Sequence, residues 1–196
     1  MLDQFFSWES LAASLGIAYI LLAARESQWC WPAAFISTLI YTVVFWEGRL
    51  PMQALLNFYY MGMAGYGFWL WQQGNQHAGA VVIHAWPWRN HLIYLCVGCL
   101  LTAIIGYVLA QHYQTQYPYL DAGITVFAML NTWLMARKVI QNWLYWQVIN
   151  SASIVLYLLT GYLATVLMFS IYLVLSFHGY ISWKKRIRLQ VDLAHR

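Results

Sequence analysis

Residues 91–110 read HLIYLCVGCLLTAIIGYVLA, and this stretch decides the class of fold that the chain can adopt. It contains no Asp, Glu, Lys or Arg. A helix that crosses the hydrocarbon core of a bilayer needs about 20 predominantly apolar residues. The stretch is therefore predicted to be a transmembrane helix, because its length meets that requirement and no charge interrupts it.

Apolar segments on both sides of this stretch predict an all-α integral membrane protein with seven transmembrane helices. The other six segments are residues 8–24, 30–46, 51–72, 120–137, 142–159 and 162–183. The longest polar stretch, residues 73–90, contains Gly, His and Pro and is predicted to be a loop. Since no connection is long enough to separate soluble domains, residues 1–196 are expected to form one transmembrane domain.

The overall composition also favours lipid as the solvent. Hydrophobic residues make up 62% of the chain and charged residues only 8%, whereas a soluble domain carries roughly 25% charged residues. The net charge of +4 does not indicate nucleic-acid binding, because the basic residues lie in short loops and in the C-terminal tail. Membrane lipid is the expected surrounding and nucleic acid is not an expected partner.

The distribution of Lys and Arg predicts the orientation. With seven spans, nine of the ten basic residues fall on the C-terminal side of the membrane, and only Arg49 falls on the other side. The nine are Arg25, Arg89, Arg137, Lys138, Lys184, Lys185, Arg186, Arg188 and Arg196. Because basic loops stay in the cytoplasm, the N-terminus is predicted outside and the C-terminus inside, in the inner membrane of a bacterium.

The chain matches itself weakly at an offset of 112 residues. Trp31 then falls on Trp143, and Ala24-Arg25 falls on Ala136-Arg137. Further pairs are Leu55 with Leu167, Tyr60 with Tyr172, Gly67 with Gly179 and Trp71 with Trp183. The offset predicts two parallel three-helix repeats, at about 8–72 and about 120–183, joined by a connector helix at about 91–110. In transporters built from parallel repeats, the substrate site lies between the repeats near mid-membrane.

Polar and aromatic groups within the predicted spans are the candidate substrate-binding residues. Such groups usually face the protein interior or a wet cavity. The candidates are Thr38, Tyr41, Asn57, Tyr60, Asn131, Trp143, Trp146 and Asn150. Thr38 and Asn150 are partners at the 112-residue offset, as a central site requires. The alternative for each residue is that it only joins neighbouring helices, at roughly 0.6 kcal/mol per hydrogen bond.

These residue types suit one kind of solute. Trp and Tyr faces attract cations by about 0.5–2 kcal/mol, and amides beside them fix the orientation of a flat ring. The predicted cargo is therefore a cationic heteroaromatic molecule. Asp121, at the outer end of its segment, either attracts the cation at the outer mouth or caps its helix.

No carboxylate lies deep in a span, so facilitated diffusion is favoured over ion coupling. We predict no catalytic residue, metal or cofactor. A rival class is a membrane thiol oxidase using the Cys96-x-x-Cys99 pair, and a second rival is a scaffold subunit that binds no small molecule.

The chain resembles the PnuC family of vitamin transporters. The resemblance is carried by Asp121, by Ala136-Arg137-Lys138 and by Asn142-Trp143-Leu144-Tyr145-Trp146 with the following Val148-Ile149-Asn150. It implies a fold like a full-length version of the SWEET sugar transporters, a homotrimer, and facilitated diffusion of nicotinamide riboside that is trapped by phosphorylation inside the cell. Asn57 departs from the Gln of nicotinamide riboside carriers, which raises thiamine, the cargo of another branch, to nearly equal rank. Riboflavin ranks third.

Overall fold

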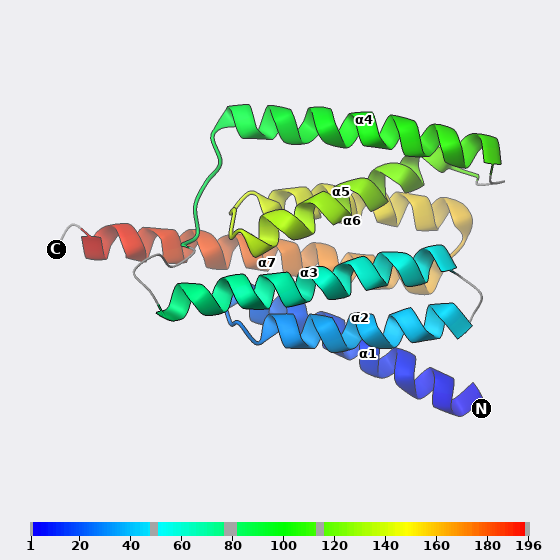
Figure 1. The fold of residues 1–196 in the computed structure, drawn as a ribbon, viewed down its shortest axis with the longest axis horizontal. Helices are drawn as coiled ribbons and strands as arrows, with labels where there is room; N and C mark the ends of the chain where they lie inside the picture. The colour runs from blue at the N-terminus through cyan, green and yellow to red at the C-terminus, as the bar shows by residue number, and fades with distance from the viewer. Residues whose placement is uncertain (1, 48–50, 77–81, 113–115, 195–196) are drawn as a thin grey trace. The chain divides into compact units, whose positions relative to one another are not determined.

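A computed structural model describes residues 2–47, 51–76, 82–112 and 116–194 (Figure 1). Within these ranges the chain forms seven α-helices, as predicted. They are α1 (Leu2–Ala24), α2 (Cys30–Glu47), α3 (Pro51–Gln76), α4 (Trp88–His112), α5 (Pro118–Ala136), α6 (Asn142–Thr160) and α7 (Leu163–Ala194). By length and composition, α4 and residues Thr165–Leu189 of α7 could cross a membrane, and Ser10–Ala24 and Cys30–Val44 are apolar but shorter.

Several helix ends differ from the prediction. The loop expected at residues 73–90 is shorter, because α3 continues to Gln76 and α4 already begins at Trp88. The first helix begins at Leu2 and the last continues to Ala194. A helix can continue into polar sequence beyond the apolar stretch, since its backbone hydrogen bonds are internal.

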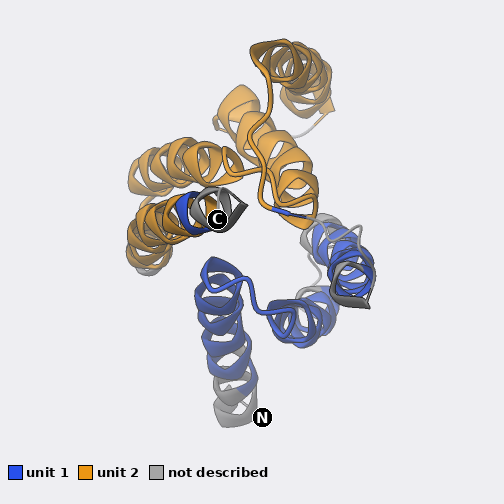
Figure 2. Cartoon of the chain, turned by 90° about the vertical axis from the view of Figure 1, so that its left-hand side faces the viewer, with its two compact units in different colours: residues 1–82, 188–196 blue, residues 83–187 orange. Residues whose placement is uncertain are grey.

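The helices gather into two compact units, residues 1–82 with 188–196 (unit 1) and residues 83–187 (unit 2) (Figure 2). Unit 1 therefore holds α1, α2 and α3, and unit 2 holds α4, α5, α6 and most of α7.

In unit 1, Trp31 at the start of α2 packs against α3. Its indole is 1% exposed and meets the Trp71 ring edge-on, with centroids 5.5 Å apart. Gly67 of α3 makes room for it, since a Cβ at that position would overlap the Trp31 ring. The Ser37 hydroxyl donates to the Ala12 carbonyl at 2.8 Å and so joins α2 to α1.

In unit 2, Trp143 of α6 has the same kind of neighbours. Its ring is 1% exposed and meets Trp183 edge-on at 5.5 Å, and a Cβ on Gly179 would overlap it. The residues of this arrangement lie 112 positions after their counterparts in unit 1. On the other side of the unit, α4 packs along α5, where Gly98 makes room for the Phe127 ring.

The loops that follow α1 and α5 also share a backbone conformation. Glu26 and Lys138, again 112 positions apart, have positive φ angles of 53° and 54°. The next residue of each loop donates back to the preceding helix, Ser27 to the Leu22 carbonyl at 3.0 Å and Val139 to the Leu134 carbonyl at 3.1 Å. Such bonds satisfy the last carbonyls of a helix.

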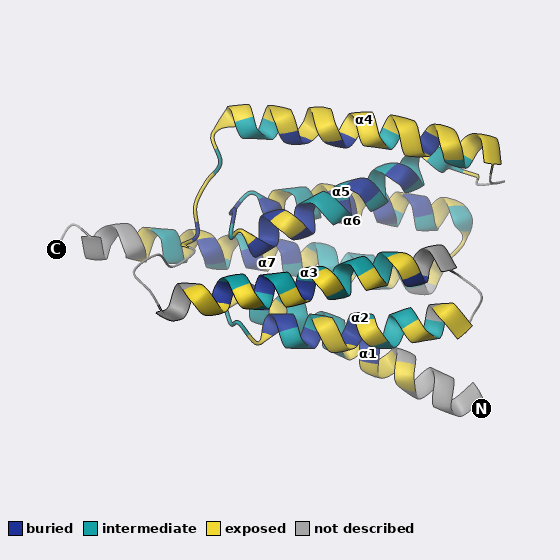
Figure 3. Cartoon of the chain, viewed as in Figure 1, coloured by how far each residue is buried: buried dark blue, intermediate teal, exposed yellow. Residues whose placement is uncertain are grey.

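Most of α4 is exposed (Figure 3). Only Tyr94, Gly98 and Gly106 of this helix are buried, and its exposed side chains include Ile93 and Leu100, which are 63% and 62% exposed. A contiguous apolar surface of this kind is costly in water and suits contact with lipid or with another apolar surface.

Candidate solute-binding site

Helix α6 carries the densest group of candidate residues. Trp143, Gln147 and Asn150 are spaced i, i+4 and i+7, so they share one face of the helix. Trp143 and Asn150 are buried, while Gln147 is half-buried. Trp146, which precedes Gln147, is half-buried as well. The face therefore combines indole and amide groups within two helical turns.

Trp143 was predicted to stack on the solute, and its ring is covered by Gly179 and Trp183 of α7. Its indole Nε1, however, is buried and has no hydrogen-bond partner among the described residues. The ring is thus part of the packing of unit 2, and Nε1 of its counterpart Trp31 in unit 1 is buried without a partner among the described residues in the same way.

Gln147 was not among the predicted site residues. Its Nε2 is shielded from solvent and has no partner in the described part of the chain. A buried donor left unpaired costs about 1–3 kcal/mol, which is a reason to look for an absent acceptor. The only feature of the sequence that could have indicated Gln147 as a site residue is its spacing of four residues from Trp143, which places both on one face of the helix.

Asn131 of α5 is fully buried, and its Nδ2 donates to the Asn142 carbonyl at 2.9 Å. Asn142 in turn donates from its side chain to the Val139 carbonyl at 2.6 Å. These bonds join α5 to the first turn of α6. Each of the two amides keeps a side-chain oxygen without a partner among the described residues. The geometry therefore gives the Asn131 N–H group a helix-joining contact.

The unit 1 candidates lie on α2 and α3. The Thr38 hydroxyl donates to the Ala34 carbonyl of its own helix at 2.8 Å. Tyr41 and Asn57 are half-buried and each takes part in a contact. Tyr60 is half-buried, with its ring 5.7 Å from that of Tyr59.

Asp121 lies in the first turn of α5, but it does not cap the helix. The cap position is held by Tyr117, whose carbonyl accepts from the Asp121 N–H at 3.0 Å. The alternative role of Asp121 as the cap of this helix was therefore wrong, because the N-cap position lies four residues earlier. The carboxylate still lies where the positive end of the helix dipole favours a negative charge.

Further observations concern residues other than those of the α6 face. A hollow of about 270 Å³ in unit 1 is lined by Trp8, Leu39, Ile40, Val43, Val44 and Glu47, none of which is a candidate. Cys96 and Cys99 are free thiols exposed on α4. Among the described residues, no group of three or more His, Cys, Asp or Glu side chains could hold a metal ion.

Helices with apolar exteriors and a largely buried face of indole and amide groups are compatible with an integral membrane carrier of a small organic solute. Residues 7–185 match the family described as nicotinamide mononucleotide transporter, and the chain belongs to that family, which includes the PnuC vitamin transporters. This membership identifies a multi-pass membrane transporter and not an enzyme.

Curated relatives carry different vitamins. The chain is 25% identical to the riboflavin/roseoflavin transporter RibM of Streptomyces davaonensis, over 96% of this chain and 90% of the relative. It is also 25% identical to the nicotinamide riboside transporter PnuC of Escherichia coli, over 90% of this chain and 85% of the relative. The same transporter of Neisseria mucosa is 25% identical, over 93% and 74% of the two chains.

A crystal structure of the vitamin B3 transporter PnuC is similar in fold. Its TM-score with this chain is 0.74 at 23% identity, and the match covers 92% of this chain and 82% of that structure. The likeness agrees with the seven-helix architecture described above.

Proposed function

We propose that the protein takes up a vitamin or vitamin precursor across the bacterial inner membrane, with the N-terminus outside and the C-terminus in the cytoplasm. Nicotinamide riboside is the leading substrate, and it moves by facilitated diffusion and is trapped by phosphorylation inside the cell. Family membership over residues 7–185 is the observation that carries this proposal.

The α6 face supplies the proposed contacts. Trp146 stacks on the heteroaromatic ring, since its indole is only half-buried. Gln147 Nε2 and Trp143 Nε1 donate to acceptors on the solute, because both are buried donors without a partner in the described structure. Asn150, one turn beyond Trp146, binds the polar edge of the ring.

The remaining predicted contacts are also part of the proposal. Tyr41, Asn57 and Tyr60 contribute ring and amide contacts, Thr38 contributes its hydroxyl, and Asp121 attracts cations at the outer mouth. Asn131 acts through the start of α6, to which its amide is bonded. The proposed assembly is a homotrimer surrounded by lipid.

We also infer that each unit contains one of two parallel three-helix repeats. Support comes from the matching Trp–Gly–Trp packing of Trp31 and Trp143 and from the matching loops at Glu26 and Lys138. Chance matches in a Trp-rich chain would not be expected to reproduce a side-chain packing and a backbone conformation in one register.

Riboflavin and thiamine are the alternative substrates. Riboflavin is favoured by the similarity to RibM, which equals the similarity to PnuC at 25% identity. Its ring system carries carbonyl acceptors that suit the free donors of α6. Thiamine is favoured by Asn57, whose amide reaches one methylene less far than a Gln.

The test is calorimetric titration of the purified protein with nicotinamide riboside, thiamine and riboflavin in separate experiments. We expect one of them to bind, and Asn150→Ala to weaken that binding by at least tenfold, or about 1.4 kcal/mol. Thr160→Ala is the matched control, because its hydroxyl bonds only within the far end of the same helix. Unchanged binding by a well-expressed Asn150→Ala protein would show that the site lies elsewhere.

A further inference from the structure

A short segment before α4, residues 83–86, lies against the α5–α6 loop, residues 137–141. The His84 N–H donates to the Lys138 carbonyl at 3.2 Å, and the Ile140 N–H donates to the His84 carbonyl at 2.9 Å. The two backbones thus form a parallel bridge between His84 and Val139. We call residues 83–86 the strap.

Gln141 clamps the other end of the strap. Its Nε2 donates to the Trp86 carbonyl at 3.3 Å, and its Oε1 accepts from the Trp86 N–H at 3.1 Å. One side chain therefore satisfies both backbone groups of Trp86, as a neighbouring β-strand would. Gln141 is also the N-cap residue of α6, and its own side chain makes no capping hydrogen bond.

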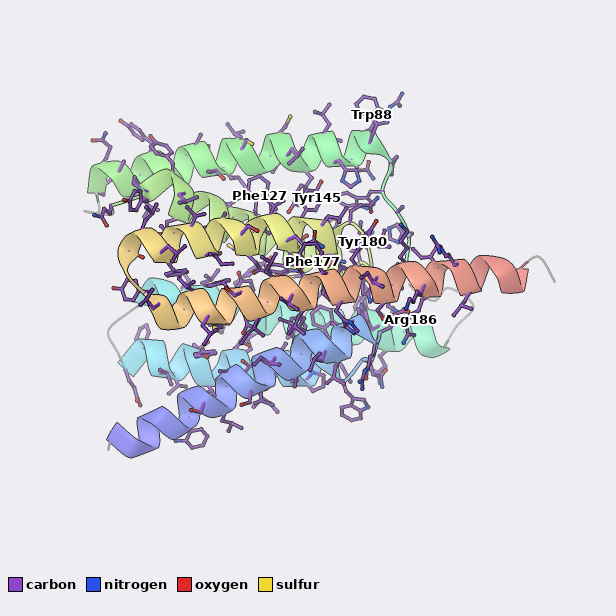
Figure 4. All side chains as sticks on the ribbon, turned by 180° about the vertical axis from the view of Figure 1, so that it is seen from behind. Trp88, Phe127, Tyr145, Phe177, Tyr180 and Arg186 are labelled. Atoms are coloured by element: carbon purple, nitrogen blue, oxygen red, sulfur yellow. The ribbon has the colours of Figure 1, made fainter. Side chains whose placement is uncertain are left out.

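The Trp86 ring anchors the strap in the aromatic packing of unit 2. It lies 5.8 Å from the His91 ring, 6.4 Å from Tyr94 and 5.9 Å from Trp133. The Tyr94 ring in turn lies 4.5 Å from that of Tyr145 of α6, tilted by 38°, and contacts Phe127 of α5. The side chains of Tyr145 and Phe127 both lie on the side of α4 (Figure 4).

Tyr145 also connects this packing to the candidate site. Its hydroxyl lies 2.8 Å from His91 Nδ1, which is hydrogen-bond distance, and Trp146 is the next residue in the chain. The strap, α4 and the first turns of α6 are therefore tied together by backbone, amide and ring contacts.

The corresponding loop of unit 1 carries a different residue at the clamp position. Trp29 lies 112 positions before Gln141 and is 64% exposed. An indole has one donor and no acceptor, so it cannot make the two-way bond that Gln141 makes. The loop backbone does not itself require a Gln, because both loops fold alike around Glu26 and Lys138.

We propose that Gln141 is a positioning residue for the substrate: by clamping the strap to the α5–α6 loop, it fixes where α6 begins and which way Trp146 and Gln147 face. The link to substrate rests on the proposed function. Trp146 and Gln147 lie only five and six residues beyond Gln141 on one helix, so a shift or rotation at the clamp moves their side chains as a rigid body.

The test compares Gln141→Met, which keeps the length of the side chain and loses both hydrogen bonds, with Thr160→Ala at the other end of α6. Hydrogen exchange of the ligand-free proteins is measured on peptides covering residues 137–146. We expect exchange there to accelerate at least about tenfold in Gln141→Met, because two hydrogen bonds are lost, and to stay unchanged in Thr160→Ala. Equal exchange in the unmodified protein and Gln141→Met would overturn the proposal.

The second readout is the affinity for whichever of the three vitamins binds. We expect Gln141→Met to weaken binding about tenfold, and saturating vitamin to slow exchange over residues 137–146 of the unmodified protein, since coupling between two sites is reciprocal. A Gln141→Met protein that exchanges faster yet binds with normal affinity would reduce the clamp to a purely structural feature and overturn its positioning role. If no vitamin binds, the proposed function fails, and the ligand-free exchange alone still decides whether the clamp holds α6.

Discussion

At the scale of single residues, glycines decide how closely tryptophans can pack. Gly67 and Gly179 each leave the space that a Trp ring occupies, whereas nothing lies within 4 Å of a Cβ added at Gly62. Large rings in a packed core have few alternative rotamers. The two glycines are therefore steric requirements of the fold.

We predict that Gly179→Ala and Gly67→Ala destabilise the protein, each by about 1–3 kcal/mol, because the new methyl group forces a Trp ring out of place. Gly62→Ala is the control, and it should leave stability unchanged or slightly raised, since Ala favours a helix over Gly. Thermal unfolding followed by tryptophan fluorescence measures the effect. Equal melting temperatures for all three variants would contradict this packing.

Gln147 gives a prediction with opposite signs for stability and binding. Gln147→Leu removes a buried donor that has no partner among the described residues. The ligand-free protein should therefore be as stable or more stable, by about 1 kcal/mol, while vitamin binding weakens about tenfold. Calorimetry and thermal unfolding of the same preparation measure both quantities.

Ser151→Ala is the matched control for Gln147→Leu, since Ser151 is exposed on the same helix. A Gln147→Leu protein that melts much earlier than the control would mean that the amide is engaged in packing. Normal affinity in that variant would remove Gln147 from the site.

At the scale of helices and loops, the α5–α6 connection depends on side-chain amides. Asn131 holds the Asn142 carbonyl, which lies at the first position of α6. We predict that Asn131→Asp destabilises the protein by about 1–3 kcal/mol, because the carboxylate cannot donate to the Asn142 carbonyl and the bond that joins α5 to α6 is lost. Thr132→Val, which removes only a bond within α5, should cost less. Urea or thermal unfolding would show the order, and a reversed order would exclude the helix-joining role.

Hydropathy predicts the helices better than their ends. Seven apolar stretches predicted seven helices, since apolar length is what a membrane requires. The N-terminal extension to Leu2 was missed because Asp3 and Gln4 interrupt the apolar pattern before Trp8. The basic run at the end of α7 was taken for a tail, although Lys and Arg are good helix formers.

The candidate site was only partly predictable for a different reason. Trp146 and Asn150 are recognisable because indole and amide groups are unusual within an apolar helix. Gln147 was missed because a polar residue beside them could equally face solvent, and only the structure shows that its N–H is buried. The contact between the strap and Gln141 was not predictable, because Gln141 and Trp86 are 55 residues apart and no local sequence pattern indicates that they meet.

At the scale of the whole molecule, the proposed orientation rests on the distribution of charge alone. We predict that a reporter fused after Arg196 is cytoplasmic, and that one fused to the chain truncated after residue 115 is outside. A green fluorescent protein should fluoresce only at the first position, and alkaline phosphatase should be active only at the second. The reverse pattern would contradict the charge asymmetry as the determinant of orientation.

The most direct test of the central claim, that the protein is a vitamin facilitator, is counterflow in proteoliposomes without an ion gradient. Vesicles preloaded with unlabelled nicotinamide riboside, riboflavin or thiamine receive the labelled compound outside. The account predicts transient accumulation of label above the outside concentration for one of these vitamins, and loss of that accumulation in Asn150→Ala. Absence of counterflow with all three vitamins, from a folded and reconstituted protein, would contradict it.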